Sequence, residues 1–155
     1  MTVTTATLGF PRIGPRRELK FALESHWSGK TSEAELLETA AGLKTAAWSR
    51  QHALGTDWLP SGDFSLYDHM LDISLMLGAV PQRYGTQAGT ADLSTYFAMA
   101  RGTNGEKGDA LTACEMTKWF DTNYHFLVPE LHARQKLALG RLSVVDAYRE
   151  AREQG

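Results

Sequence analysis

Three cationic side chains lie close together near the start of the chain, where a loop leads into an expected helix. Arg16 and Arg17 are predicted to occupy the first turn of that helix, and Lys20 follows within the next turn. Because the helix dipole disfavours a cation at this end by about 0.3–1 kcal/mol, an anion bound to the free backbone N–H groups would offset the cost. Arg17 and Lys20 share a helix face and could hold a carboxylate or a phosphate. The alternative is a solvated surface on which Glu18 and Glu24 neutralise the cations.

A second set of candidate residues combines carboxylates with an imidazole, which are common ligands of zinc and magnesium. The set consists of Asp63, Asp68, His69 and Asp72. Asp68 and Asp72 have i, i+4 spacing and are expected on one helix face beside His69. The same residue types are frequent on exposed helices, and Asp63 is a favoured type of helix N-cap. We expect a structural role for these residues rather than a metal site.

A third group of candidates surrounds a lysine in the segment 115–125. The polar and aromatic residues gathered there are Lys118, Trp119, Phe120, Asn123, Tyr124 and His125. Lys118 could contact an acidic ligand, and the aromatic rings could stack on a planar ring of that ligand. The alternative is that the aromatic side chains pack into the core. Both interpretations remain open from the spacing alone.

Hydrophobic periodicity and capping signals predict the elements that would position the first group. Residues 2–8 are rich in β-branched side chains and predict a short strand. A helix is expected over 15–29, with Leu19 and Leu23 on its apolar face. A second helix is expected over 32–55, because a serine and a glutamate at its start have capping-box spacing and a glycine follows its end.

The rest of the chain predicts further short elements of the same two kinds. They are a strand at 58–60, a helix at 66–77, a helix near 91–100, a strand at 136–139 and a helix opened by Ser143 and Asp146. Segments 81–89 and 103–108 lack periodicity and are expected to be surface loops. Strands alternating with helices indicate an α/β fold, here a helix-rich set of βα units from a (β/α)8 TIM-type barrel. Such a barrel takes about 250 residues, so it would be incomplete within this chain.

Composition restricts the classes of protein to consider. The chain has 155 residues, of which 43% are hydrophobic and 22% charged, with a formal net charge of -2. This length favours one compact domain with a sizeable core, and the balanced charge argues against nucleic acid or an anionic membrane as a partner. There is no apolar run long enough for a transmembrane helix and no signal-peptide pattern. The single cysteine, Cys114, cannot form an internal disulfide and is expected to be a small buried hydrophobe. Because neither a disulfide nor a signal peptide is indicated, we expect a cytoplasmic protein.

Three motifs, in this order, resemble the N-terminal part of cobalamin-independent methionine synthases. They are TLGFPRIGPRRELK at 7–20, LPSGDFSLYDHML at 59–71 and EMTKWFDTNYHFLVPE at 115–130, and the likeness covers essentially the whole chain. The resemblance implies a methyltransferase of methionine biosynthesis. Such an enzyme moves a methyl group from 5-methyltetrahydropteroyl-triglutamate, a folate, to homocysteine without cobalamin. It also implies that residues 1–155 form the N-terminal part of the first of two barrels, with no complete second domain.

The resemblance further implies which residues contact the substrate. The folate-binding positions of the family match Arg17, Glu18, Leu19, Lys20 and Lys118. This agrees with the charge pattern, because a polyglutamate tail is a string of carboxylates that complements a group of cations. We therefore expect these residues to bind the methyl-folate polyglutamate.

Catalysis, by the same resemblance, depends on parts of the protein outside this chain. The family's zinc, which stabilises the homocysteine thiolate, is held by a histidine, two cysteines and a glutamate of the C-terminal barrel, and those ligands are absent here. No catalytic or metal-binding residue is expected in this chain, which would work with the remainder of the first barrel and with the C-terminal barrel. The alternatives are a stand-alone, non-catalytic module that binds folate or polycarboxylates, or a helical interaction protein.

Overall fold

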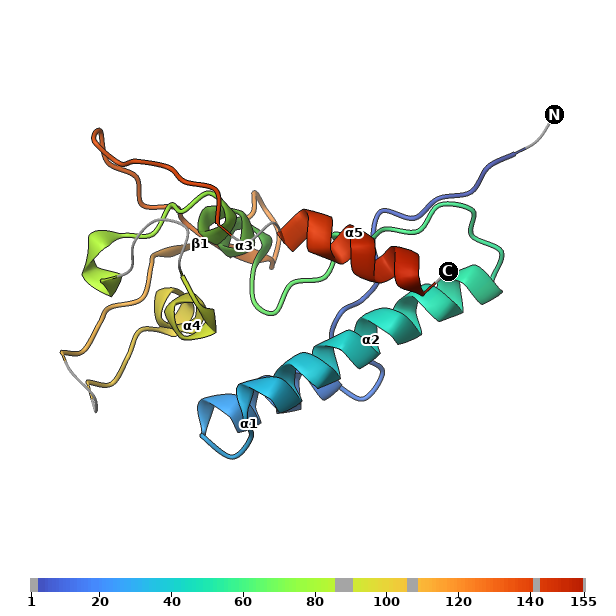
Figure 1. Ribbon diagram of the computed structural model, residues 1–155, viewed down its shortest axis with the longest axis horizontal. Helices are drawn as coiled ribbons and strands as arrows, with labels where there is room; N and C mark the ends of the chain where they lie inside the picture. The colour runs from blue at the N-terminus through green and yellow to red at the C-terminus, as the bar shows by residue number, and fades with distance from the viewer. Residues whose placement is uncertain (1–2, 86–90, 106–108, 141–142, 155) are drawn as a thin grey trace. The chain divides into compact units, whose positions relative to one another are not determined.

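The computed structural model describes residues 3–85, 91–105, 109–140 and 143–154 of the chain (Figure 1). The chain divides into two compact units. Unit 1 comprises Met1–Leu66 with Val144–Gly155, and unit 2 comprises Tyr67–Ser143. The boundaries between them do not coincide with either of the polar loops expected from the sequence.

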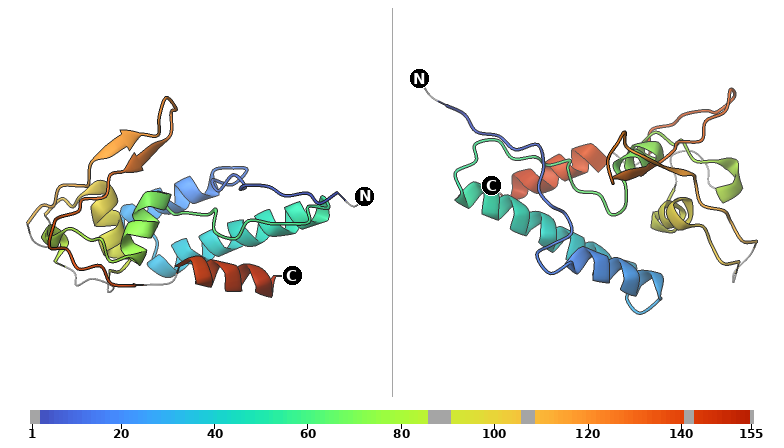
Figure 2. Two further views of the ribbon diagram at one scale, coloured as in Figure 1. Left: turned by 90° about the horizontal axis from the view of Figure 1, so that it is seen from above. Right: turned by 180° about the vertical axis from the view of Figure 1, so that it is seen from behind.

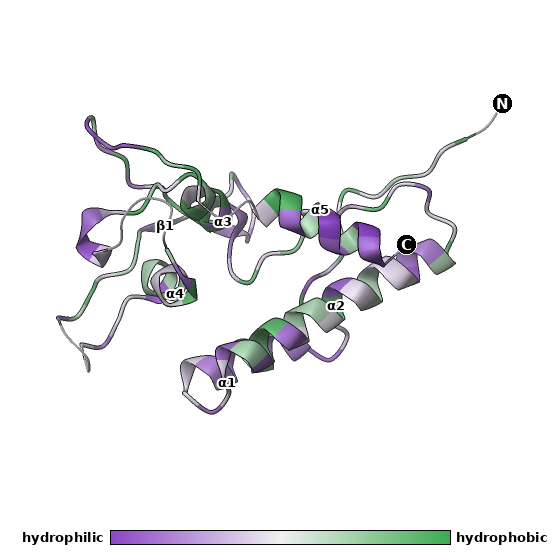
Figure 3. Ribbon diagram, viewed as in Figure 1, coloured by the Kyte–Doolittle hydropathy of each residue, from purple (hydrophilic) through white to green (hydrophobic). Residues whose placement is uncertain are grey.

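Unit 1 is built on helices α1 (Glu18–Trp27) and α2 (Glu33–Ala53), which pack against each other. Its other helix is α5 (Ser143–Glu153). The predicted second helix and its capping box are confirmed, because the Ser32 hydroxyl accepts the Glu35 N–H and the Glu35 carboxylate accepts the Ser32 N–H. Figure 3 shows polar and apolar residues alternating along α2, as expected of a helix with one buried side.

The core of unit 1 lies between α1 and α2. Leu19 and Leu23 of α1 are buried, which confirms the predicted apolar face of that helix. Leu36, Ala40 and Trp48 are buried on α2. These residues recur at intervals of four or eight positions, so a single side of each helix is removed from water.

The strand predicted over residues 2–8 does not form in the described part of that segment. A single parallel bridge joins Ala6 to Trp58, and the Trp58 N–H donates to the Thr5 carbonyl at 3.0 Å. The expected strand at 58–60 is reduced to the same bridge. Val3 and Leu8 are exposed. A strand needs a neighbour along its length to satisfy its amides and bury its side chains, and in the described residues this pairing is limited to one position.

Unit 2 places helices against a small hairpin. In chain order it contains α3 (His69–Met76), the 3₁₀ turn η1 (Gln82–Tyr84), α4 (Leu93–Arg101), β1 (Met116–Lys118) and β2 (His125–Leu127). The buried apolar side chains include Leu71, Tyr96, Phe97, Met99 and Leu127. The helix expected near 91–100 is confirmed, and α3 ends before Gly78 as predicted.

Strands β1 and β2 form an antiparallel hairpin that the sequence did not predict. Met116 pairs with Leu127, Thr117 with Phe126 and Lys118 with His125. Figure 2 shows the two strands side by side, extending away from α3 and α4. Each strand has three residues, too few for an alternating hydrophobic pattern to stand out.

The strand predicted at 136–139 is wrong. Within the described ranges this segment has no strand partner, and one backbone N–H group within it and one directly after it donate instead to carbonyls at the end of α3. The Ala138 N–H donates to the Leu77 carbonyl at 3.1 Å, and the Gly140 N–H donates to the Met76 carbonyl at 2.8 Å. These bonds satisfy carbonyls at the C-terminal end of the helix, which have no partner within it.

The expected loops are only partly described. Segment 81–89 includes η1, and its residues 86–89 lie outside the described residues. In segment 103–108 the described residues 103–105 form neither helix nor strand, while 106–108 lie outside them.

The chain is therefore of mixed helix and strand structure, consistent with the α/β class. Its described part contains one two-stranded antiparallel sheet and one parallel bridge. No helix within the described residues combines the length and hydrophobicity needed to span a membrane.

Candidate anion-binding site

The backbone at the start of α1 differs from the prediction, because the helix begins at Glu18. Arg16 and Arg17 precede the helix, and Arg17 is its N-cap, in the left-handed conformation with φ 64° and ψ 35°. The cause is a tight turn after Gly14, whose φ is +84°. The Arg17 N–H donates to the Gly14 carbonyl at 3.1 Å and closes this turn.

The Glu18 carboxylate takes the place in which an external anion was expected. Glu18 Oε2 accepts the Arg16 backbone N–H at 2.9 Å, and Glu18 Oε1 accepts the Arg16 Nε–H at 3.1 Å. Hydrogen bonds from its own backbone N–H and from that of Arg16 lower the pKa of Glu18. An internal anion thus already interacts with the positive end of the helix.

The three cations at the start of α1 differ in their partners. Lys20 Nζ lies 3.7 Å from the Glu24 carboxylate, in an exposed pair of the kind that contributes little. Arg16 is paired with Glu18, so the solvated-surface alternative holds for Arg16 and Lys20. The Arg17 side chain is exposed and forms no ion pair or hydrogen bond with any residue that the structure describes. Arg17 is therefore the cation of this group that a ligand can contact without displacing an ion pair among the described residues.

Leu19 has a different role from its neighbours. Its side chain is completely buried. Its backbone N–H donates to the Ile13 carbonyl at 3.1 Å. Leu19 anchors α1 in the core, so its side chain is not accessible to a ligand.

Lys118 lies at the end of β1, in unit 2, and is exposed. The aromatic residues near it are also exposed, at 46% for Trp119, 83% for Phe120 and 44% for Tyr124. Trp119 makes edge-to-face contacts with Phe120 and with Phe126, at centroid distances of 5.1 and 5.5 Å. The alternative in which this aromatic group packs into the core does not hold for these three side chains. Its rings lie on the hairpin surface beside a cation.

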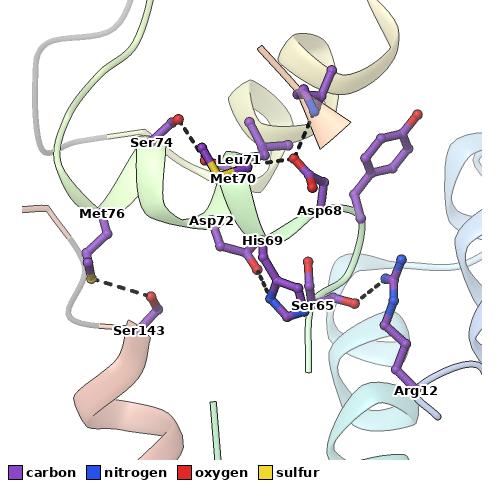
Figure 4. Close-up of polar contacts among 12 residues, drawn as sticks. Arg12, Ser65, Asp68, His69, Met70, Leu71, Asp72, Ser74, Met76 and Ser143 are labelled. Carbon is purple, nitrogen blue, oxygen red and sulfur yellow. Dashed lines mark hydrogen bonds and ion pairs between the residues drawn. The ribbon is translucent and has the colours of Figure 1, made fainter. Parts of the chain in front are cut away.

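The residues of the expected acidic cluster make structural contacts, and Asp68, His69 and Asp72 lie at the start of α3 (Figure 4). Asp68, and not Asp63, is the N-cap of α3. Asp63 instead accepts the Phe10 N–H at 2.7 Å. His69 Nδ1 lies 3.8 Å from the Asp72 carboxylate. Among the described residues, no three His, Cys, Asp or Glu side chains are grouped so that they could hold a metal ion.

Cys114 is buried, as predicted, and burial raises the pKa of its thiol. The sequence did not indicate the polar cluster around it. Arg83 forms an ion pair with Glu130, and its Nη2 lies 3.6 Å from the Cys114 Sγ. The Tyr84 hydroxyl donates to the Thr112 carbonyl at 2.8 Å. These partners are far apart in the sequence, so no local pattern could reveal them.

Comparison with known proteins identifies the family. Residues 4–155 match the family model described as the N-terminal domain of cobalamin-independent synthase. A 5-methyltetrahydropteroyltriglutamate–homocysteine methyltransferase of Caulobacter vibrioides is 54% identical, over 100% of this chain and 22% of its own length. A protein of the same name from Nitrobacter winogradskyi is also 54% identical, over 97% of this chain and 21% of its own length. The chain spans about a fifth of the length of these curated relatives. It belongs to the N-terminal domain family of the cobalamin-independent synthases.

Proposed function

We propose that this chain is the N-terminal part of a methyltransferase that forms methionine. The reaction moves the methyl group of 5-methyltetrahydropteroyltriglutamate to homocysteine, the two substrates that the names of the relatives contain. Within that enzyme the chain would form part of the first (β/α)8 barrel. Its own contribution would be to bind the triglutamate tail of the folate through Arg17, Lys20 and Lys118.

The observation that carries this proposal is that the Arg17 side chain is exposed and has no ion pair or hydrogen bond among the described residues. A guanidinium that precedes a helix, is exposed and has no partner among the described residues can form a two-pronged contact with a carboxylate. Lys20 can exchange its exposed contact with Glu24 for a ligand carboxylate at little cost, because both side chains are about half exposed. Lys118 is a third exposed cation. A triglutamate tail carries several carboxylates, so more than one exposed cation can contact it.

Glu18 limits how the tail can bind. Because its carboxylate already accepts the Arg16 backbone N–H, a ligand anion would have to displace it to reach the amides before α1. We therefore assign the contacts with the tail to side-chain cations rather than to the helix N-terminus. Glu18 would then keep Arg16 away from the ligand and leave Arg17 as the contacting arginine.

The zinc site implied by the resemblance does not fit the residues of this chain. That site takes two cysteines, whereas the chain has one. Cys114 is buried, and burial raises the pKa of its thiol and so disfavours the thiolate that binds a metal. We assign no step of thiol activation to this chain, and we propose that the remainder of the protein supplies it.

Isothermal titration calorimetry of the 155-residue chain tests the proposal. The ligands are 5-methyltetrahydropteroyltriglutamate and its monoglutamate, each at low and at high salt. We expect the triglutamate to bind more tightly and with the stronger salt dependence, because the additional carboxylates contact the cations. Arg17→Ala and Lys118→Ala should each weaken triglutamate binding about five-fold, the effect of one charge contact of about 1 kcal/mol.

Two variants control for the loss of charge alone. Lys30→Ala and Lys136→Ala each remove an exposed lysine, from unit 1 and unit 2 respectively, and should leave both affinities unchanged. Equal losses of monoglutamate and triglutamate binding in Arg17→Ala and Lys118→Ala would contradict contact with the tail. Tight triglutamate binding that is independent of these cations would place the tail elsewhere.

A further inference from the structure

The carboxylate of Asp68 joins three separate parts of unit 2. Asp68 is buried, with 3% of its surface exposed. Its Oδ2 accepts the Leu71 N–H at 3.0 Å and the Leu127 N–H at 3.1 Å, and its Oδ1 accepts the Tyr124 hydroxyl at 3.1 Å. Figure 4 shows the carboxylate directed at the Leu71 amide from the start of α3. All three contacts use Asp68 as an acceptor.

These contacts exceed what a helix cap requires. An N-cap carboxylate needs to accept an N–H from the first turn of its own helix, which Leu71 provides. Among the described residues, Asp92, the N-cap of α4, accepts hydrogen bonds only from its own first turn, from the Thr95 N–H at 2.8 Å and the Ser94 hydroxyl at 2.9 Å. Asp68 additionally binds two residues that lie 56 and 59 positions later in the chain.

Both additional partners lie in or directly before β2, the strand that pairs with the one that carries Lys118. Leu127 is the last residue of β2, and Tyr124 immediately precedes that strand. The Tyr124 carbonyl accepts the Trp119 N–H at 2.8 Å, and Trp119 follows Lys118 directly. Lys118 itself pairs with His125 in the register of the hairpin. One buried carboxylate thus fixes both ends of the segment that positions Lys118.

We propose that Asp68 is a positioning residue for folate binding, because it holds the β1–β2 hairpin and thereby sets the place of Lys118. This inference rests on the proposed function, in which Lys118 contacts the triglutamate tail. Without Asp68 the hairpin would lose its attachment to α3, and its own pairing would open more often. Binding would then include the entropic cost of ordering the hairpin and Lys118, which lowers the affinity for the ligand.

Substitutions separate this role from that of a cap. Asp68→Ala removes all three contacts. Asp68→Asn retains them, because its amide oxygen can face the two N–H groups while its NH₂ donates to the Tyr124 hydroxyl, which also accepts. Tyr124→Phe removes the Oδ1 contact and leaves the cap intact. Asp92→Ala is the matched control, since it removes a cap of the same kind in the same unit without touching the hairpin.

The first measurement is amide hydrogen exchange of Trp119 by NMR, without ligand. The Trp119 N–H does not contact Asp68, so it reports the order of the hairpin rather than the loss of a bond to the carboxylate. We expect Asp68→Ala and Tyr124→Phe to accelerate this exchange at least about five-fold, the effect of one lost hydrogen bond. Asp68→Asn and Asp92→Ala should leave it unchanged. Unchanged exchange in Asp68→Ala, or in Tyr124→Phe if Asp68→Ala does not fold, would overturn the proposal.

The second measurement is a double-mutant cycle of triglutamate affinity. We expect Asp68→Ala to weaken binding by about the same factor as Lys118→Ala, roughly five-fold, and to add nothing in the presence of Lys118→Ala. When Asp68→Ala is combined with Arg17→Ala, the factors by which the two substitutions weaken binding should multiply. A general loss of structure would instead weaken binding in every background. If the unmodified chain binds no triglutamate, the proposed function fails, while the exchange of Trp119 still decides whether Asp68 holds the hairpin.

Discussion

Asp57 Oδ2 accepts two hydrogen bonds from Thr5, one from its backbone N–H at 2.8 Å and one from its hydroxyl at 2.9 Å. The Asp57 N–H donates in return to the Thr5 hydroxyl oxygen at 3.2 Å. These bonds fix the N-terminal segment against residue 57 beside the single parallel bridge. The bonds from the Thr5 N–H, and then from its hydroxyl, lower the pKa of Asp57.

Asp57→Asn should reduce the stability of the chain at neutral pH. The folded-state pKa of Asp57 lies below its ordinary value of 3.8. Its contribution to the unfolding free energy is therefore present above pH 3.8 and is lost as the pH falls through the lowered pKa. The difference in unfolding free energy between the unmodified chain and Asp57→Asn should therefore shrink below pH 3.8. Urea unfolding followed by circular dichroism from pH 7 to pH 2 measures it. Glu38→Gln, an exposed change in the same unit, should show no such trend.

Alanine should have opposite effects at two glycines of unit 1. Gly14 has a φ of +84°, and a Cβ added there would lie 2.2 Å from Glu18 Oε2 and 2.9 Å from Leu43 Cδ2. Gly14→Ala should cost about 1–3 kcal/mol. Gly42 lies inside α2 with nothing within 4 Å of such a Cβ, so Gly42→Ala should add about 0.5–1 kcal/mol. Urea unfolding at pH 7 compares the two. A neutral Gly14→Ala would contradict the turn described before α1.

Arg17 should show a conflict between stability and binding. Its left-handed backbone costs about 1 kcal/mol for a residue with a Cβ, a cost that glycine does not have. Arg17→Gly should therefore raise the unfolding free energy by about that amount relative to Arg17→Ala. Both variants should lose triglutamate affinity to the same degree, since both lack the guanidinium. Denaturation and calorimetry on the same two proteins test this, and full binding by Arg17→Gly would exclude Arg17 as a contact.

Unit 2 should lose stability in alkali. Burial, the largest cause, raises the pKa of Tyr84 from 10.0 to about 12 and also raises that of Cys114. The stability that these two groups contribute is complete when the pH lies below their ordinary pKa values. It is lost as the pH rises through the raised pKa values. Tyr84→Phe should cost about 1 kcal/mol at pH 7, for the bond to Thr112, and should lessen the loss of stability between pH 10 and 12. Tyr148→Phe, at an exposed phenol, is the control. An identical alkaline profile for both variants would refute the assignment to Tyr84.

The features that the sequence predicted correctly are local. The capping box of Ser32 and Glu35 joins residues three positions apart, and the apolar faces of α1 and α2 repeat within one or two turns. Such patterns are decided by neighbours in the sequence, so they can be recognised without knowing the fold. The binding role expected of Arg17, Lys20 and Lys118 rests on their residue types, their spacing and the family resemblance, and it stays a prediction.

The features that were missed depend on residues far apart in the sequence. The contacts of Asp68 with Tyr124 and Leu127 and the pair of Arg83 with Glu130 have no local signature. The β-branched segment 2–8 has the composition of a strand, but a strand also requires a neighbour along its length. The exposed aromatic group shows the same limitation, because its composition suited both a core and a surface. In each case pairing over long distances, and not local propensity, decides the structure.

The ion pair of Lys44 with Glu150 joins residues that are 106 positions apart, and both belong to unit 1. All of unit 2 is encoded between them. At about 5–20 residues per second a ribosome needs about 5–20 s to make that stretch, whereas paired helices form within microseconds to milliseconds. The α1–α2 pair can thus fold early in translation and must wait for α5 while the hairpin and its helices are being synthesised. The order of synthesis makes unit 2 the first of the two units whose sequence is complete.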